Sequence, residues 1–164
     1  MMGFEGSYVW QLREVWGPKL LVGIGAETIV TNSQGQVLLG MRNDLKQWAT
    51  FGGHIDPKED ILACALRELH EETGLQPERN NMVPIGFLSA YDKVLNVFPN
   101  GHEMQSLALA FTVAFEGEAE AMDGEYDAFA WFDLDKLPEN MQTFSKSSIV
   151  LYRAWLETKQ FQVM

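Results

Sequence analysis

The stretch GGHIDPKEDILACALRELHEETGL, residues 52–75, contains the clearest helix signal in the chain. Glu59 and Asp60 enrich its expected first turn in acidic side chains, and Gly74 stands where helices commonly end. Between these bounds, apolar residues recur at helical spacing. The pattern predicts a helix over residues 60–73, preceded by a loop that contains a glycine pair.

The same helix carries three carboxylates close together. At about 100° per residue, Glu68, Glu71 and Glu72 fall on an arc beside the apolar stripe, at the edge of the side that faces the core. Carboxylates three and four residues apart repel each other and cost stability. Arg67 lies one turn before Glu71, where it can pair with that carboxylate and hold its orientation. The stripe itself consists of Ile61, Leu62, Ala65, Leu66, Leu69 and Thr73.

Two interpretations of the carboxylate group are open. A run of charges on a helix is commonly a solvated face. Here the group borders the buried stripe and follows a loop with two glycines, which favours a binding site. Carboxylate oxygens are the ligands that Mg²⁺ and Mn²⁺ prefer, with water and substrate phosphates completing the coordination. The sequence therefore predicts a divalent-metal site, with Mg²⁺ as the expected ion and Mn²⁺ as its alternative.

The spacing of the residues around the helix matches a known pattern. Gly53 is followed after five residues by Glu59, and after seven more by the run RELHEETGL, residues 67–75. This arrangement resembles the Nudix box, GX5EX7REUXEEXGU with U aliphatic, at every fixed position. The hairpin expected before the box and the late segment WFDL, residues 131–134, are also similar to the family. One departure is Phe51, where many members carry proline.

The resemblance implies both a fold and a reaction. The fold is α+β, the Nudix fold, with an α/β/α sandwich around a mixed β-sheet; the length suits a single domain over residues 1–164. The reaction is metal-dependent hydrolysis of a phosphoric anhydride bond in a nucleoside diphosphate linked to a moiety X. The expected partner is a small nucleotide-type phosphorylated substrate: a nucleoside triphosphate, a dinucleoside polyphosphate, ADP-ribose or a nucleotide sugar.

The resemblance also implies roles for the residues of the box. Glu68, Glu71 and Glu72 are expected to bind the metal, and one of them can double as general base. Arg67 is expected to orient a carboxylate by a salt bridge. Gly53 belongs to the expected metal site because it permits a close backbone approach. The structural positions of the motif are Gly53, Glu59 and Gly74.

Family members sometimes draw a further catalytic carboxylate from outside the box. Glu125, six residues before Trp131, is the candidate in this chain, and Glu118 and Glu120 are the alternatives. A solvated acidic loop explains each of the three equally well.

Substrate choice is expected to rest on residues downstream of the box. The candidates for stacking on or hydrogen-bonding a base or sugar are Tyr91, Phe98, Asn100, His102, Glu103 and Gln105. A tyrosine in about the region of Tyr91 is similar to a marker of the dinucleoside polyphosphate hydrolases in the family. His54, directly after the glycines, can approach a substrate phosphate, although loop structure explains it as easily. Cys64 is expected to be a small buried filler of the helix.

The remaining elements are read from apolar patterning and turn residues. A mixed order of strands and helices, with helices central and late, favours an α+β layered domain. Expected strands cover residues 20–31, 36–42, 48–51, 82–91, 105–115 and 128–132. Expected helices cover residues 8–15, 60–73 and 145–159, with one helical turn at 133–137 and a turn at 98–101.

Composition limits the partners and the compartment. The net charge is −11 and the isoelectric point is about 4.6, so the surface repels polyanions and no stable nucleic-acid complex is expected. The single cysteine, Cys64, forms no intramolecular disulfide and suits a reducing, cytoplasmic location. No segment reads as a signal peptide or a membrane span. The oligomeric state, including a homodimer, stays open.

Two other classes of function compete with hydrolysis. One is a non-catalytic, Nudix-like sensor or regulatory domain that binds a nucleotide without cleaving it; the intact box argues against it. The other is a structural or interaction protein with an acidic helix, which would show no dependence on divalent metal.

Overall fold

The computed structural model describes residues 6–98, 100–122 and 124–164. Its helices are α1 (Tyr8–Trp16), α2 (Ile61–Thr73), the short 3-10 helix η1 (Arg79–Asn81), α3 (Tyr91–Val94) and α4 (Thr143–Thr158). Its longer strands are β1 (Leu21–Thr31), β2 (Val37–Arg42), β5 (Val83–Leu88), β7 (Glu103–Ala114) and β8 (Tyr126–Phe132). Its shorter strands are β3 (Trp48–Ala49), β4 (Phe51–His54), β6 (Leu95–Val97) and β9 (Gln162–Val163).

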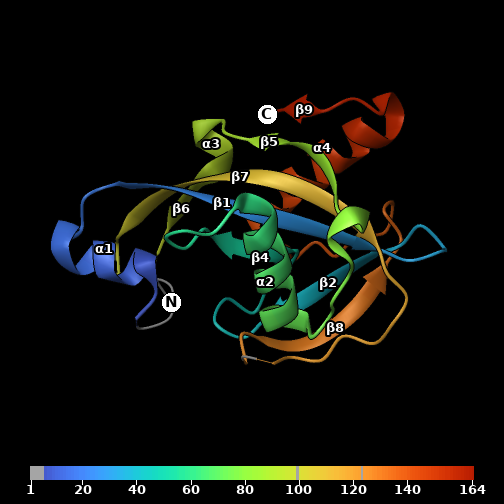
Figure 1. Cartoon of the computed structure of the whole chain (residues 1–164), viewed down its shortest axis with the longest axis horizontal. Coiled ribbons are helices and arrows are strands. Elements are labelled where there is room, and N and C mark those ends of the chain that lie inside the picture. Colours follow the sequence, from blue (N-terminus) through green and yellow to red (C-terminus); the bar gives the residue numbers. More distant parts are fainter. Residues whose placement is uncertain (1–5, 99, 123) are drawn as a thin grey trace.

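The described strands form one mixed sheet with a helix packed on each face (Figure 1). The order through the sheet is β3-β2-β1-β7-β5-β9, while β4 pairs with β1, β6 with β7 and β8 with β2. At its centre, β1 and β7 run parallel in continuous register, from Leu21 opposite Met104 to Thr31 opposite Ala114. None of the described helices is long and apolar enough to cross a lipid bilayer.

The two faces of the sheet bury separate cores. Ala26 and Val30 of β1 pack with Leu69 on the α2 side, whereas Ile29 packs with Ile149 on the α4 side. Successive side chains of a strand point to opposite faces, so β1 supplies both cores. Burial on both faces explains why β1 reads as an almost continuous apolar run rather than as an alternating one.

The predicted central helix and its glycine end are confirmed, but Glu59 and Asp60, which were expected in its first turn, precede it, and Asp60 is its N-cap. The Asp60 side chain accepts hydrogen bonds from the backbone N–H groups of Leu62 and Ala63, which would otherwise lack partners in the first turn. At the other end Gly74 adopts a left-handed conformation with φ of 71°, and its N–H donates to His70 O. Both caps fix where α2 begins and ends.

Three of the expected elements differ in the structure. The strand expected over residues 82–91 ends at Leu88, because the next two N–H groups donate to Met164 O and α3 follows. The expected helical turn at 133–137 contains a hydrogen-bonded turn but no helix. The glycine pair was expected in a loop, yet Gly53 lies in β4 opposite Ala26. In the expected turn at 98–101, residue 99 lies outside the described residues.

Candidate functional site

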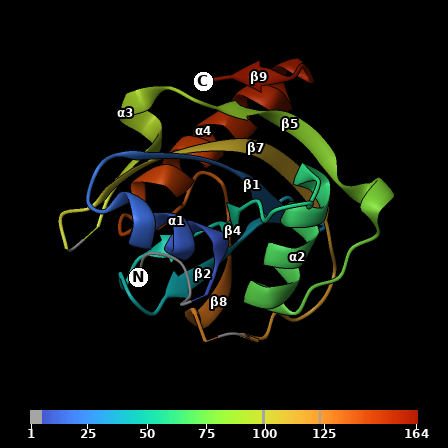
Figure 2. The same cartoon turned by 60° about the vertical axis from the view of Figure 1, so that its left-hand side comes forward.

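One cavity of about 430 Å³ opens where β1, β4 and the flank of α2 meet. Further parts of its wall come from α1, from β6 and β7, from the residues that lead into β8, and from the start of α4. Figure 2 shows β4 between α1 and α2, the two helices that contribute to opposite sides of this region. The cavity therefore gathers segments from most of the chain length.

All three carboxylates expected from the box line this cavity, but their environments differ. The Glu71 side chain is 49% exposed and that of Glu68 is 17% exposed, whereas Glu72 is buried. The Glu72 carboxylate accepts a hydrogen bond of 2.8 Å from the N–H of Gly52 and a longer one, 3.4 Å, from the hydroxyl of Tyr126. Glu72 is thus held against the strand, while Glu71 is the most exposed of the three.

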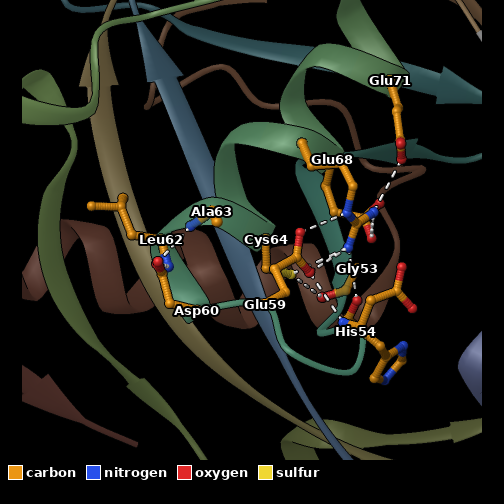
Figure 3. Close-up of polar contacts among 11 residues, drawn as sticks. Gly53, His54, Glu59, Asp60, Leu62, Ala63, Cys64, Glu68 and Glu71 are labelled. Atoms are coloured by element: carbon orange, nitrogen blue, oxygen red, sulfur yellow. Dashed lines mark hydrogen bonds and ion pairs between the residues drawn. The ribbon is translucent and has the colours of Figure 1, made fainter.

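Figure 3 shows Glu59 ahead of α2 and the carboxylates Glu68 and Glu71 on it. Arg67 connects the carboxylates of α2 to the segment before the helix. It donates from Nε and Nη2 to the two oxygens of Glu59, at 2.8 and 2.9 Å, which is the bidentate geometry of a strong ion pair. Its Nη1 donates to Glu68 at 2.8 Å and to Glu71 at 3.1 Å. The pairing of Arg67 with Glu71 that the spacing predicted is therefore present, within a larger network that also includes Glu59 and Glu68.

Gly53 leaves room for the Glu68 carboxylate. A Cβ atom at this position would lie 2.3 Å from Glu68 Oε1, closer than real Cβ contacts allow. The close approach expected at Gly53 is thus an approach of a helix side chain to the strand backbone.

Burial and mutual repulsion alter the acidity of this group. Burial raises the pKa of Glu68 to about 7, and the charges of Glu71 and Glu125 add to the rise against the opposing effect of Arg67. The pKa of Glu72 is raised well above its ordinary value, first by burial and then by the charges of Glu68 and Glu125. A group of carboxylates that favours protonation in this way is also one that a cation would stabilise.

Glu125 lines the same cavity, in the segment that leads into β8. Its Oε2 lies 3.1 Å from Arg42 Nη1, and Arg42 also pairs with Asp44 at 2.9 Å. Glu118 and Glu120, the alternatives considered from sequence, are exposed and are not among the described residues of the cavity wall. The geometry therefore favours Glu125, whose catalytic role stays a prediction.

The chemistry of these side chains fits a divalent cation. Glu68, Glu71, Glu72 and Glu125 offer hard oxygen donors on one cavity wall. In their present orientations, however, no three acidic, histidine or cysteine side chains of the described residues converge closely enough to hold an ion. Glu68 faces Arg67 instead, and Glu72 is hydrogen-bonded to the strand. Metal binding by the box carboxylates therefore remains a prediction.

The candidate substrate residues separate into two groups. Phe98 lines the cavity, whereas Tyr91, His102 and Gln105 are absent from its described wall. Tyr91 begins α3 and is 52% exposed. The β7 residues in the cavity wall are Ser106, Leu107 and Ala108, and Gln105 just before them is not part of it. The position of the cavity therefore does not support substrate binding by Tyr91, His102 or Gln105, and their expected roles stay untested predictions.

Sequence reasoning missed a buried carboxyl group in this cavity. Glu27 lies in β1, is 5% exposed, and accepts hydrogen bonds from the hydroxyls of Thr50 and Ser148. Burial raises its pKa to about 8, so the carboxyl is mostly protonated at pH 7. The available signal was a single acidic residue within the apolar run of residues 20–30.

His54 lines the cavity beside two uncharged polar residues. Its Nε2 lies 3.1 Å from Ser106 Oγ, which also accepts a hydrogen bond from Asn96 Nδ2. Burial lowers the pKa of His54 to about 4, so the imidazole is neutral at pH 7. Cys64 is fully buried and burial raises the pKa of its thiol to about 12, in accord with the filler role expected from sequence.

Comparison with known proteins places the chain in a family. The family described as NUDIX domain matches residues 22–152, which is most of the chain and begins after α1. The chain therefore belongs to the NUDIX domain family.

Its relatives and structural neighbours agree with this assignment. The chain is 32% identical over 127 residues to the m7GpppN-mRNA hydrolase NUDT17 of Bos taurus, covering 70% of this chain and 42% of that protein. It is 28% identical over 134 residues to an RNA pyrophosphohydrolase of Roseobacter denitrificans, covering 74% of this chain and 83% of that protein. The solved MutT NUDIX hydrolase from Burkholderia pseudomallei has the same fold, with a TM-score of 0.64 at 22% identity over 79% of this chain and 97% of that one. The family, the α+β Nudix fold and the hydrolase class predicted from sequence are confirmed.

Proposed function

We propose that this chain is a divalent-metal-dependent pyrophosphohydrolase that cleaves a nucleoside diphosphate linked to a moiety X. The observation that carries the proposal is the position of four carboxylates, Glu68, Glu71, Glu72 and Glu125, on the wall of one cavity. The cavity volume of about 430 Å³ lies in the range of small-molecule sites. The substrate is a nucleoside triphosphate, a dinucleoside polyphosphate, ADP-ribose or a nucleotide sugar.

Each residue of the site has a defined task in this proposal. Glu68, Glu71 and Glu72 hold Mg²⁺, or Mn²⁺ in its place, which when bound offsets the pyrophosphate charge and lowers the pKa of a coordinated water. Arg67 fixes the direction of Glu68 and Glu71 through its hydrogen bonds. A cavity carboxylate takes the proton of the attacking water as general base. Glu125, next to Arg42, is the candidate outside the box.

The two relatives named for RNA substrates add RNA 5′ ends to the substrates worth testing. The net charge of −11 argues against a long polyanion, because the protein surface as a whole repels it. A single nucleotide contacts only the cavity and not the rest of the acidic surface. A cation bound in the cavity then offsets most of the repulsion that the nucleotide meets.

A substrate panel tests the proposal directly. The purified chain is incubated with nucleoside triphosphates, dinucleoside polyphosphates, ADP-ribose, nucleotide sugars, 5′-triphosphorylated RNA and capped RNA, each with Mg²⁺ and with Mn²⁺. Products are identified by chromatography, and Glu72→Gln serves as the inactive control. We expect hydrolysis of at least one small nucleotide, at a rate above that of the control. No turnover of any compound with either metal would overturn the proposal.

The alternative is a nucleotide-binding sensor without catalysis. It predicts that nucleotides raise the melting temperature of the protein while no product forms. The same panel, read out by thermal shift as well as by chromatography, separates the two functions.

A further inference from the structure

Glu27 lies in the wall of the cavity on the opposite side of β4 from α2. In the sheet it pairs with Gly52, whose N–H donates to Glu72 on the α2 side. The Glu27 side chain instead reaches Ser148 of α4. Two buried carboxyl groups therefore flank one glycine, and the family box accounts for only one of them.

The two oxygens of Glu27 are not equivalent. Oε1 accepts hydrogen bonds from Thr50 Oγ1 and from Ser148 Oγ, the latter at 3.3 Å. Within the described residues no hydrogen bond is formed to Oε2, and Oε2 is not one of the fully buried side-chain atoms that lack a partner, so it is accessible from the cavity. A Cβ atom on Gly52 would lie 2.9 Å from Oε2, so the glycine leaves space around this oxygen. Because Glu27 lines the cavity, Oε2 is the atom left for a ligand.

The protonation state determines what Oε2 can offer. Burial raises the pKa of Glu27 to about 8, in spite of the hydrogen bonds from Thr50 and Ser148. Because Oε1 already accepts two hydrogen bonds, the protonated form of Glu27 carries its proton on Oε2. The group is then a neutral donor that faces the cavity, where water or a ligand can accept its hydrogen bond.

Between β7 and the start of α4 the cavity wall near Glu27 is uncharged, and Arg42 is the charged wall residue whose field acts on Glu27. Ala108 of β7 lies opposite Gly25, two residues before Glu27, and Leu107 precedes it in the wall. From α4 come Phe144, whose carbonyl accepts from Ser148, and Gln142 just before the helix. Apolar and neutral polar surface of this kind suits a planar, uncharged group better than it suits phosphate.

We propose that Glu27 is a specificity residue that reads the nucleobase of the substrate, by donating a hydrogen bond from its carboxyl group to a carbonyl oxygen or ring nitrogen of the base. This inference rests on the proposed function only for the orientation of the nucleotide, with phosphates toward α2 and the base toward α4. No motif of the sequence assigns such a role to Glu27.

The decisive comparison is between two substitutions. Glu27→Gln keeps an acceptor for Thr50 and Ser148 and replaces the O–H donor with an N–H donor, so it mimics the neutral acid. Glu27→Ala removes the donor. With ATP, GTP, CTP and UTP as substrates, we expect Glu27→Ala to raise KM about tenfold for the bases that Glu27 contacts, the effect of one lost hydrogen bond, with kcat nearly unchanged. Glu27→Gln should stay within about threefold of the wild type.

Tripolyphosphate, used as a competitive inhibitor, is the base-free control. Its inhibition constant should be the same for all variants, because it makes no contact with the base-binding part of the cavity. Glu157→Gln, an exposed carboxylate on α4, is the matched control substitution. If Glu27→Ala does not fold, Glu27→Met fills the same space without a donor. Any of three results overturns the inference. The first is an equal loss of nucleotide affinity in Glu27→Gln and Glu27→Ala. The others are weaker inhibition of the Glu27 variants by tripolyphosphate, and an unchanged KM of Glu27→Ala for all four nucleoside triphosphates.

A binding measurement separates this inference from the proposed function. Calorimetric titration with AMP, GMP, CMP and UMP in the absence of metal requires no turnover. At least one of them should bind the wild type and bind Glu27→Ala about tenfold more weakly, even if the substrate panel shows no hydrolysis. Absence of binding by all four to the wild type overturns the role of Glu27.

Discussion

Arg67 and Glu59 form a bidentate ion pair, with both guanidinium–carboxylate distances below 3 Å: Nε to Oε1 is 2.8 Å and Nη2 to Oε2 is 2.9 Å. The Glu59 side chain is 14% exposed and that of Arg67 is 28% exposed, so the pair is only partly screened by water. The remaining donors of Arg67 reach Glu68 and Glu71. The Arg67 side chain thus links Glu59, which precedes α2, to two of the expected metal ligands.

We expect Arg67→Lys to lower activity even though the substitution keeps the positive charge. An ammonium cannot reproduce the planar fork that holds both oxygens of Glu59 while also reaching Glu68. The free energy of unfolding should fall by about 1–3 kcal/mol, the range for hydrogen bonds to charged groups. Denaturant unfolding and steady-state kinetics measure the two effects. Arg79→Lys, in the exposed pair with Asp60, is the control and should change neither.

Glu72→Gln should separate activity from stability. Glu72 is buried, and burial together with the charges of Glu68 and Glu125 raises its pKa well above the ordinary value. Glutamine has the same shape, and its side-chain oxygen can accept from the N–H of Gly52. We expect the melting temperature to be kept while activity falls by about a hundredfold or more, the range for loss of an essential ionisable group. Glu71→Gln should also lose most activity. Full turnover by both variants with every active substrate would show that the metal ligands are assigned wrongly.

Gly53→Ala should destabilise the protein through Glu68. The added Cβ meets Glu68 Oε1 at 2.3 Å, so the carboxylate must move away from the strand. The carboxylate is the end of a flexible side chain and can swing away, so we expect a loss of about 1 kcal/mol in the free energy of unfolding, from the weakened hydrogen bond between Arg67 and Glu68. In the Glu68→Ala background the same glycine substitution should cost clearly less, because the clashing atoms are gone. Equal costs in the two backgrounds would exclude this contact as the cause.

Stability should depend on pH through Glu27. Its folded-state pKa of about 8 lies above the ordinary value of 4.5, so the folded state binds the proton more tightly than the unfolded state. The resulting contribution is fully present below the ordinary pKa and is lost as the pH rises through about 8. Glu27→Gln cannot titrate. We therefore expect the wild type to lose more stability than Glu27→Gln between pH 5 and pH 8 in denaturant unfolding without metal; parallel pH profiles would contradict the raised pKa.

Removal of divalent metal should abolish hydrolysis, and its return should stabilise the fold. A cation among Glu68, Glu71 and Glu72 offsets their repulsion and binds only the folded state, which stabilises it by about 2.7 kcal/mol at a hundredfold excess over Kd. Activity with EDTA, and thermal shift on adding Mg²⁺ or Mn²⁺, are the measurements. The variant Glu68→Gln/Glu72→Gln should show a much smaller shift. An unchanged melting temperature for the wild type with either metal would favour the structural alternative considered from sequence.

The sequence alone determined the central helix, its glycine C-cap and the set of carboxylates on its flank. These features depend on neighbours three and four residues apart, and such neighbours meet in any α-helix whatever surrounds it. The same local rules located most of the longer strands. These local rules placed Gly53 in a loop and Tyr91 in a strand. In the structure Gly53 pairs with β1, and the two residues before Tyr91 donate hydrogen bonds to Met164 O. Both are long-range contacts, which local patterns do not reveal.

Only the tertiary structure decided which distant residues share the cavity. Glu27 and Ser106 meet there because β1 and β7 run parallel at the centre of the sheet and direct side chains toward the same opening. Glu125 reaches it because β8 pairs with β2 and carries the preceding segment to Arg42. On β7 the cavity begins at Ser106, so Gln105, a substrate candidate from sequence, is not part of its wall. Spacing along the chain fixed the reactive group on α2, and the packing of the sheet fixed what surrounds it.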